Sequence, residues 1–164
     1  MPAWAPLVHG ARTYDLSHLD PFYRDIDTGE RSIEVAVDFG SHAFSDKTAK
    51  GFPIPNTERF FCAHRYESSF IAADFMRRDF PDCHLRAFLN KKDQQQFFTT
   101  DAGGIAVFMS IQVPANSVNR LKCHVVSAYD PTWGRFDLPM RGRLYRAGVV
   151  LKRKVEGLQI PTYK

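Results

Sequence analysis

Histidine and cationic side chains occur together on two segments that alternate like β-strands. His84 and Arg86 stand two residues apart on the first segment, and Lys122 and His124 stand two apart on the second. Because successive side chains of a strand point to opposite faces, each pair shares one face. Imidazole exchanges a proton near neutral pH, and arginine and lysine bind phosphate and stabilise developing negative charge. The chemistry that fits is acid–base cleavage of a phosphodiester without a metal, with both histidines as acid–base candidates and Arg86 and Lys122 as phosphate binders. The alternative is a solvated basic face without catalysis.

A third histidine, His42, belongs to the segment Ser41-His42-Ala43-Phe44-Ser45-Asp46. Its serine, histidine and aspartate form a nucleophilic triad only if they converge in space, and the sequence has no Gly-x-Ser-x-Gly elbow. We therefore take His42 as a general acid or base candidate on a loop. Arg65 lies at the start of a predicted helix, where anions are attracted, so it is either a phosphate contact or a solvated cap residue.

Each of the three cysteines has a histidine close by in the sequence. The pairs are Cys62 with His64, Cys83 with His84, and Cys123 with His124. Structural zinc sites use two to four intervening residues, and adjacent side chains on a strand diverge, so we expect no metal site and no cofactor. The cysteines are instead expected to be small buried residues, and their odd number favours a reducing cytoplasm over a disulfide framework.

The composition of the 164 residues is that of a globular protein, with 44% hydrophobic and 24% charged residues. The net charge of +4 suits a polyanionic partner such as RNA or another nucleic acid, although many proteins of this charge bind none. The basic segments 141–143 and 152–154 are candidate nucleic-acid contacts or protected strand edges. No signal peptide and no membrane-spanning apolar run is recognisable, which argues for a cytoplasmic protein without a membrane partner.

The elements that would position these groups can be read from the hydrophobic pattern. Residues 31–39 alternate as a strand, and 40–56 form a long loop. A helix is predicted from about residue 65 to about 80, with Tyr66, Phe70 and Ala73 on one stripe. Four strands follow, at 84–89, 95–101, 105–113 and 119–129, and a further strand is predicted at 143–152.

This order predicts one α+β domain over residues 1–164, with an irregular segment at 1–30. Its antiparallel sheet would be a meander of four to six strands, with one main helix packed on one face. The aliphatic side chains Leu85, Ala87, Leu121 and Val125 would face that helix. The side chains of His84, Arg86, Lys122 and His124 would then lie on the open face.

The segment from about residue 66 to 131 resembles the barnase/EndoU/RelE-like group of small ribonucleases and toxins. Its closing residues, Val125-Val126-Ser127-Ala128-Tyr129-Asp130-Pro131, are similar to the small-residue–aromatic ending of some bacterial toxin domains. The resemblance implies a small ribonuclease-like protein of toxin or mobile-element type, in which Ser127 and Tyr129 orient the substrate. Residues 1–60 depart from that group.

A non-enzymatic role is the second hypothesis from the sequence. A protein- or nucleic-acid-binding module from a phage, prophage or defence system would use the open sheet face and the loop at 40–56 as its contact surface. The 14 phenylalanines fit such a partner interface. Convergence of histidine and arginine side chains in a cleft would favour the enzyme, whereas a flat apolar patch would favour the module.

Overall fold

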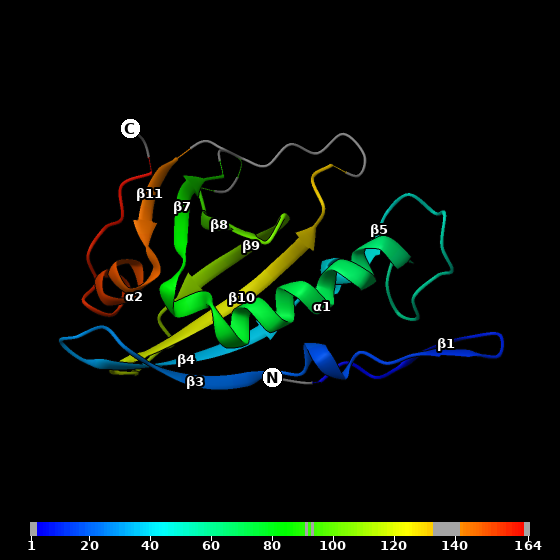
Figure 1. Ribbon diagram of the computed structural model, residues 1–164, viewed down its shortest axis with the longest axis horizontal. Helices are drawn as coiled ribbons and strands as arrows, with labels where there is room; N and C mark the ends of the chain where they lie inside the picture. The colour runs from blue at the N-terminus through cyan, green and yellow to red at the C-terminus, as the bar shows by residue number, and fades with distance from the viewer. Residues whose placement is uncertain (1–2, 91, 93, 133–141, 163–164) are drawn as a thin grey trace.

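The computed structural model describes residues 3–90, 92, 94–132 and 142–162 (Figure 1). Within these residues the chain forms an α+β fold, as the sequence predicts, around a sheet with the strand order β11-β7-β8-β9-β10-β4-β3. The seven strands of this sheet are β3 (Phe22–Asp27), β4 (Ser32–Phe39), β7 (His84–Leu89), β8 (Gln96–Ala102), β9 (Ile105–Gln112), β10 (Arg120–Tyr129) and β11 (Arg143–Arg146). The α-helices are α1 (Ala63–Arg78) and α2 (Ala147–Val155).

The predicted meander is confirmed. Strands β7, β8, β9 and β10 are antiparallel neighbours, and their bounds lie within one residue of the predicted ones. Gly103 and Gly104 join β8 to β9 with φ angles of +62° and +95°. Glycine adopts such angles without steric cost, which is why this pair marks the hairpin in the sequence.

Strand β4 lies beside β10, and the two run parallel (Figure 1). The other neighbouring pairs of this sheet in the described residues are antiparallel. After β4 the chain passes through α1 and the meander before it returns as β10. Two segments far apart in the sequence thus become adjacent, which antiparallel hairpins alone would not produce.

The expectation of an irregular segment at 1–30 is wrong. This part forms the hairpin of β1 (Leu7–His9) and β2 (Arg12–Tyr14), the short helix η1 (Ser17–Leu19) and strand β3. Strand β3 is hard to recognise because Arg24 stands between Phe22 and Ile26 on the face that packs against the helices. The Arg24 guanidinium is accommodated there by donating to the backbone carbonyl of Arg77.

Helix α1 begins near the predicted position, but its buried side differs from the predicted stripe. Phe70 is exposed and stacks on His18 of η1, with ring centroids 3.6 Å apart. The buried side chains of α1 are small or flexible, and they are Ser68, Ser69, Ala72, Ala73 and Met76. Small residues let the helix approach the sheet closely, so the bulkiest residues did not indicate the buried side.

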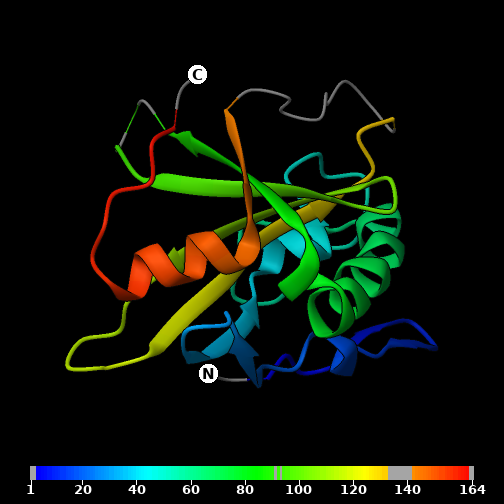
Figure 2. The ribbon, with the colours of Figure 1, turned by 60° about the vertical axis from the view of Figure 1, so that its left-hand side comes forward.

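The predicted strand at 143–152 is only partly correct. Strand β11 ends at Arg146, and residues 147–155 form α2. Ala147, Val150 and Leu151 are buried, which is the i, i+3, i+4 spacing of a helix, but a short apolar run does not distinguish the two structures. Helices α1 and α2 cover the same face of the sheet and share one hydrophobic core with it (Figure 2).

The loop at 40–56 contains the short helix η2 (Ser41–Ala43) and strand β5 (Ser45–Asp46), which pairs with β6 (Phe60–Phe61). A further short helix, η3 (Phe80–Asp82), follows α1. In the described part of the chain, neither α-helix combines the length and the apolar character needed to cross a membrane.

Candidate functional site

The sheet face opposite the helices carries the predicted polar cluster. Leu85, Ala87 and Cys123 are fully buried on the helix side, so His84, Arg86, Lys122 and His124 project from the other side, as predicted. His84 and Arg86 are nevertheless far from His124, since β8 and β9 lie between β7 and β10. Three strand spacings amount to about 14 Å, so a shared acid–base site of His84 and His124 is ruled out. Arg86 instead donates to the carbonyl of Gly142 at 3.2 Å.

His124 is held by a carboxylate that sequence reasoning missed. Its Nδ1 atom lies 2.7 Å from Oδ1 of Asp38, which is its register partner on β4. The Asp38 carboxylate also lies 3.7 Å from Nζ of Lys122, through its second oxygen. The Asp38 side chain is 18% exposed and that of His124 39%, so the imidazole remains accessible while its partner is shielded. An aspartate on Nδ1 fixes the ring orientation and leaves Nε2 for proton transfer.

Gly40 provides the space for the other edge of the imidazole. A Cβ atom at this position would lie 3.1 Å from Nε2 of His124 and 3.3 Å from the carbonyl oxygen of Val126. The Gly40 N–H donates to the carbonyl of Val125 at 2.8 Å, which ties the end of β4 to β10. The Nε2 edge of His124 therefore lies against the backbone where β4 ends and η2 begins.

His42 of η2 lies near this edge and is surrounded by cations. Arg65, in the first turn of α1, donates from Nη1 to the His42 carbonyl at 3.0 Å. Partial desolvation lowers the pKa of His42 below its usual value, and the positive charges of Arg59, Arg65, Lys47 and His124 lower the pKa further. The neutral imidazole is thus favoured, which is the form that a general base requires.

A β-bulge at Val126 determines which side chains accompany His124. Strict alternation from His124 would place Ser127 and Tyr129 on the helix face. The register against β9 shifts between Val125 and Ser127, so both side chains return to the open face. The guanidinium of Arg65 then lies 5.7 Å from the centre of the Tyr129 ring. His42 therefore lies near His124, Arg65 lies beside Tyr129, and Lys122, His124, Ser127 and Tyr129 follow one another along the open face of β10. His84 and Arg86 lie three strands away.

Residues 6–149 match the YjaZ family, and this range includes all the residues of the site. The chain belongs to the YjaZ family. Neither a curated protein nor a solved structure matches it. The resemblance to barnase/EndoU/RelE-like ribonucleases stays a prediction.

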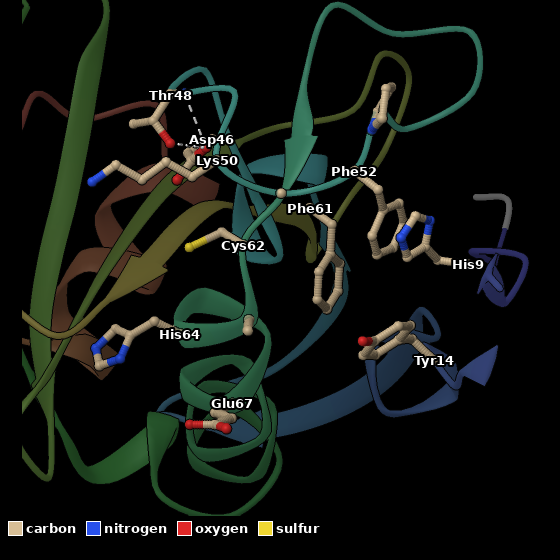
Figure 3. A pocket seen from close by; sticks show the side chains of 13 residues that line it. His9, Tyr14, Asp46, Thr48, Lys50, Phe52, Phe61, Cys62, His64 and Glu67 are labelled. Atoms are coloured by element: carbon tan, nitrogen blue, oxygen red, sulfur yellow. Dashed lines mark hydrogen bonds between the residues drawn. The ribbon is translucent and has the colours of Figure 1, made fainter. Parts of the chain in front are cut away.

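The YjaZ-family chain also has a cleft of about 850 Å³ between the β1–β2 hairpin and the start of α1 (Figure 3). One side is a stack in which His9 lies 4.4 Å from Phe52, and Phe52 lies 4.8 Å from Phe61, between ring centroids. Cys62 and His64 lie on the other side of the cleft (Figure 3). Burial raises the pKa of the Cys62 thiol, which keeps it protonated and weakly nucleophilic.

The remaining sequence hypotheses concern metals and a triad. Across the described ranges, His, Cys, Asp and Glu side chains form no group of three that could hold a metal ion in this YjaZ-family chain. Cys123 is buried on the helix face while the neighbouring His124 lies on the open face, which confirms that their side chains diverge. Asp46 accepts hydrogen bonds from the backbone N–H and the hydroxyl of Thr48, and it lines the cleft. The Asp46 carboxylate therefore orients Thr48. This arrangement gives no support to a catalytic triad of Asp46 with His42.

Proposed function

We propose that this YjaZ-family chain is a metal-independent, ribonuclease-like enzyme that cleaves RNA phosphodiester bonds by histidine acid–base catalysis. The observation that supports it most is the His124–Asp38 pair at 2.7 Å, on an open face and close to His42. A histidine whose Nδ1 is bound by a carboxylate has a fixed orientation and exchanges its proton through Nε2, which is a recurring arrangement for proton transfer.

The two histidines differ in a way that suggests their roles. His42 is kept neutral by partial desolvation and by nearby cations, so it is the general base that removes the proton from the 2′-hydroxyl. The O2′ atom attacks phosphorus, and the P–O5′ bond breaks. His124, whose protonated form is paired with Asp38, gives its proton to O5′ as the general acid. The products are a 2′,3′-cyclic phosphate and a 5′-hydroxyl, and no oxidant, metal or second reactant is required.

Cations at both sides of His124 would neutralise the phosphate. Lys122 precedes His124 by two residues on the same face, and Arg65 lies at the far side beside Tyr129. Guanidinium and ammonium groups stabilise the extra negative charge that develops on the phosphate oxygens in the transition state. Ser127 and Tyr129 lie between Lys122 and Arg65 and would orient the ribose. The free state of Cys62, Cys83 and Cys123 supports placing this activity in the reducing cytoplasm.

The test is cleavage of a fluorogenic single-stranded RNA at low salt and in the presence of EDTA. We expect wild type to cleave and His124→Ala to lose at least about 100-fold in rate. His84→Ala is the matched control, because it removes another histidine from the same face three strands away, and it should cleave like wild type. Absence of any RNA cleavage by the wild type, or equal losses for both variants, would overturn the proposal.

A non-enzymatic nucleic-acid- or protein-binding module remains the second candidate. The observation in its favour is an apolar hollow of about 360 Å³ on the open face, lined largely by aromatic rings. Stoichiometric binding of a partner without turnover, unaffected by His124→Ala, would identify this alternative.

A further inference from the structure

Four aromatic rings occupy the open face beside the proposed catalytic pair. Phe88, Phe97, Phe108 and Tyr129 come from β7, β8, β9 and β10, and we call them the aromatic platform. Phe108 contacts both neighbours, at 5.6 Å from Tyr129 and 5.9 Å from Phe88 between ring centroids, and Phe88 lies 5.8 Å from Phe97. The platform is therefore one continuous surface across the meander.

The platform is hollowed and separate from the core. Its rings line the 360 Å³ hollow together with Asn90, Val126 and Ser127. All four rings are only partly buried, and none belongs to the hydrophobic core that the two helices share with the sheet. Asn90 and Ser127 add hydrogen-bonding groups at the rim. The hollow thus offers flat apolar surfaces with a few polar contacts, which is suitable for a planar heterocyclic ring.

The register of the strands places this hollow next to His124. Phe108 is the partner of Ser127 on β10, and its neighbour Ser110, two residues further along β9, is the partner of His124. Phe108 and His124 are therefore on the same face of the β9–β10 pair, a diagonal step apart with the Val126 bulge between them. A nucleotide whose phosphate contacts His124 can reach Phe108 with its base.

Positive charge flanks the platform on two sides. Arg86 lies in the same cross-strand row as Phe108, with Thr99 between them. Arg65 stands over the Tyr129 ring at the other end. Aromatic faces between two arginines complement a strand that alternates planar bases with negative phosphates.

We propose that the aromatic platform binds unpaired bases of single-stranded RNA next to the phosphate at His124. This inference rests on the proposed function and names its substrate class. Bases of a duplex are stacked on each other and cannot offer a face to the platform, whereas unpaired bases stack readily on phenylalanine and tyrosine. Arg86, which lies too far from His124 to act in catalysis, binds the backbone beside the platform.

The experiment measures binding separately from cleavage. Fluorescence anisotropy with a labelled 2′-O-methyl oligouridine reports affinity without turnover, since the modified 2′ oxygen cannot attack the phosphate. We expect Phe108→Ala and Phe108→Leu to raise Kd about tenfold each, because the ring and not its volume provides the stacking. Phe70→Ala removes an exposed ring from α1, on the other side of the sheet, and should bind like wild type. The same oligonucleotide annealed to its complement should bind at least about tenfold more weakly than the single strand.

The outcomes separate this inference from the proposed function. His124→Ala should abolish cleavage of unmodified RNA, and its Kd for the 2′-O-methyl probe should rise less than the Kd of the Phe108 variants. If wild type binds the probe through Phe108 but cleaves no RNA, the ribonuclease proposal fails and the platform stands. If wild type cleaves RNA but the Phe108 variants bind like wild type, the platform proposal is overturned. Equal affinity for the duplex, or binding of an apolar peptide in place of the oligonucleotide, would also overturn it.

Discussion

The Nδ1 atom of His124 and the Oδ1 atom of Asp38 lie 2.7 Å apart, although 86 positions separate the two residues in the chain. They are direct partners in the parallel pair β4–β10. The contact therefore depends on the return of the chain to β4 after the whole meander. A histidine that would otherwise be a solvated side chain on an exposed strand acquires a fixed orientation from this contact.

Replacement of Asp38 by asparagine should show how much this contact contributes. The amide is nearly the same size but does not stabilise an imidazolium, so we expect kcat for RNA cleavage to fall by about 10- to 1,000-fold. KM and the midpoint of thermal unfolding should change little. A rate like that of the wild type, measured with the fluorogenic RNA, would show that His124 acts without Asp38.

Gly40→Ala should impair the site by steric means. The new Cβ would lie 3.1 Å from Nε2 of His124, so the imidazole must shift by a few tenths of an ångström. We expect a fall in kcat of about tenfold or more, at a cost in stability of about 1–2 kcal/mol. Gly10→Ala is a control for glycine loss, since a Cβ there has no neighbour within 4 Å, although its φ of +61° adds strain. Full activity of Gly40→Ala would show that the Nε2 edge is not used.

The acid limb of the pH–rate profile should depend on the charges around His42. Partial desolvation and neighbouring cations lower the pKa of His42. As pH falls, His42 therefore remains neutral, and able to act as a base, to a pH below its usual pKa. Lys47 is exposed, and Lys47→Gln removes one of these charges. The pKa of His42 then rises, and the acid limb of kcat/KM should move to higher pH. If the acid limb of kcat/KM lies at the same pH in Lys47→Gln and in His42→Ala as in the wild type, His42 is not the base.

His18 should make folding stability depend on pH. The pKa of His18 is lowered to about 4, mainly by burial; the charge of Arg77 also lowers it, while the charges of Asp15 and Asp20 oppose the shift. The unfolded chain, with a pKa of 6.5, binds the proton more readily, so this contribution is complete above pH 6.5 and is lost as pH falls towards 4. The loss is roughly 2 kcal/mol, allowing for partial exposure.

Urea unfolding at pH 7 and pH 4.5 measures this effect of His18. His18→Gln keeps a hydrogen-bonding group opposite the Ser69 hydroxyl, which lies 2.6 Å from Nε2, but has no proton to gain. The variant should lose less stability than wild type between the two pH values, by about the amount given above. Equal losses would show that His18 is not responsible, since carboxylates titrate alike in both proteins.

Local patterns in the sequence were sufficient for much of the fold. The alternation of residues 84–89 and 119–129 predicted both strands, and it predicted the faces of their side chains as far as the bulge at Val126, because that periodicity is a property of a regular extended backbone. Patterns of this kind fail where a distant partner accommodates a charged residue, as the carbonyl of Arg77 does for Arg24. They also fail where a short apolar run fits a helix as well as a strand, as at 147–151.

The sequence by itself determined which side chains could do chemistry and which strands would carry them, since residue type and local periodicity are encoded in adjacent positions. Only the tertiary structure decided which of them meet. The parallel pairing of β4 with β10 gives Asp38 to His124, the bulge at Val126 turns Tyr129 to the open face, and two intervening strands separate His84. Strand order and bulges depend on how distant segments pack together, and no local pattern specifies them.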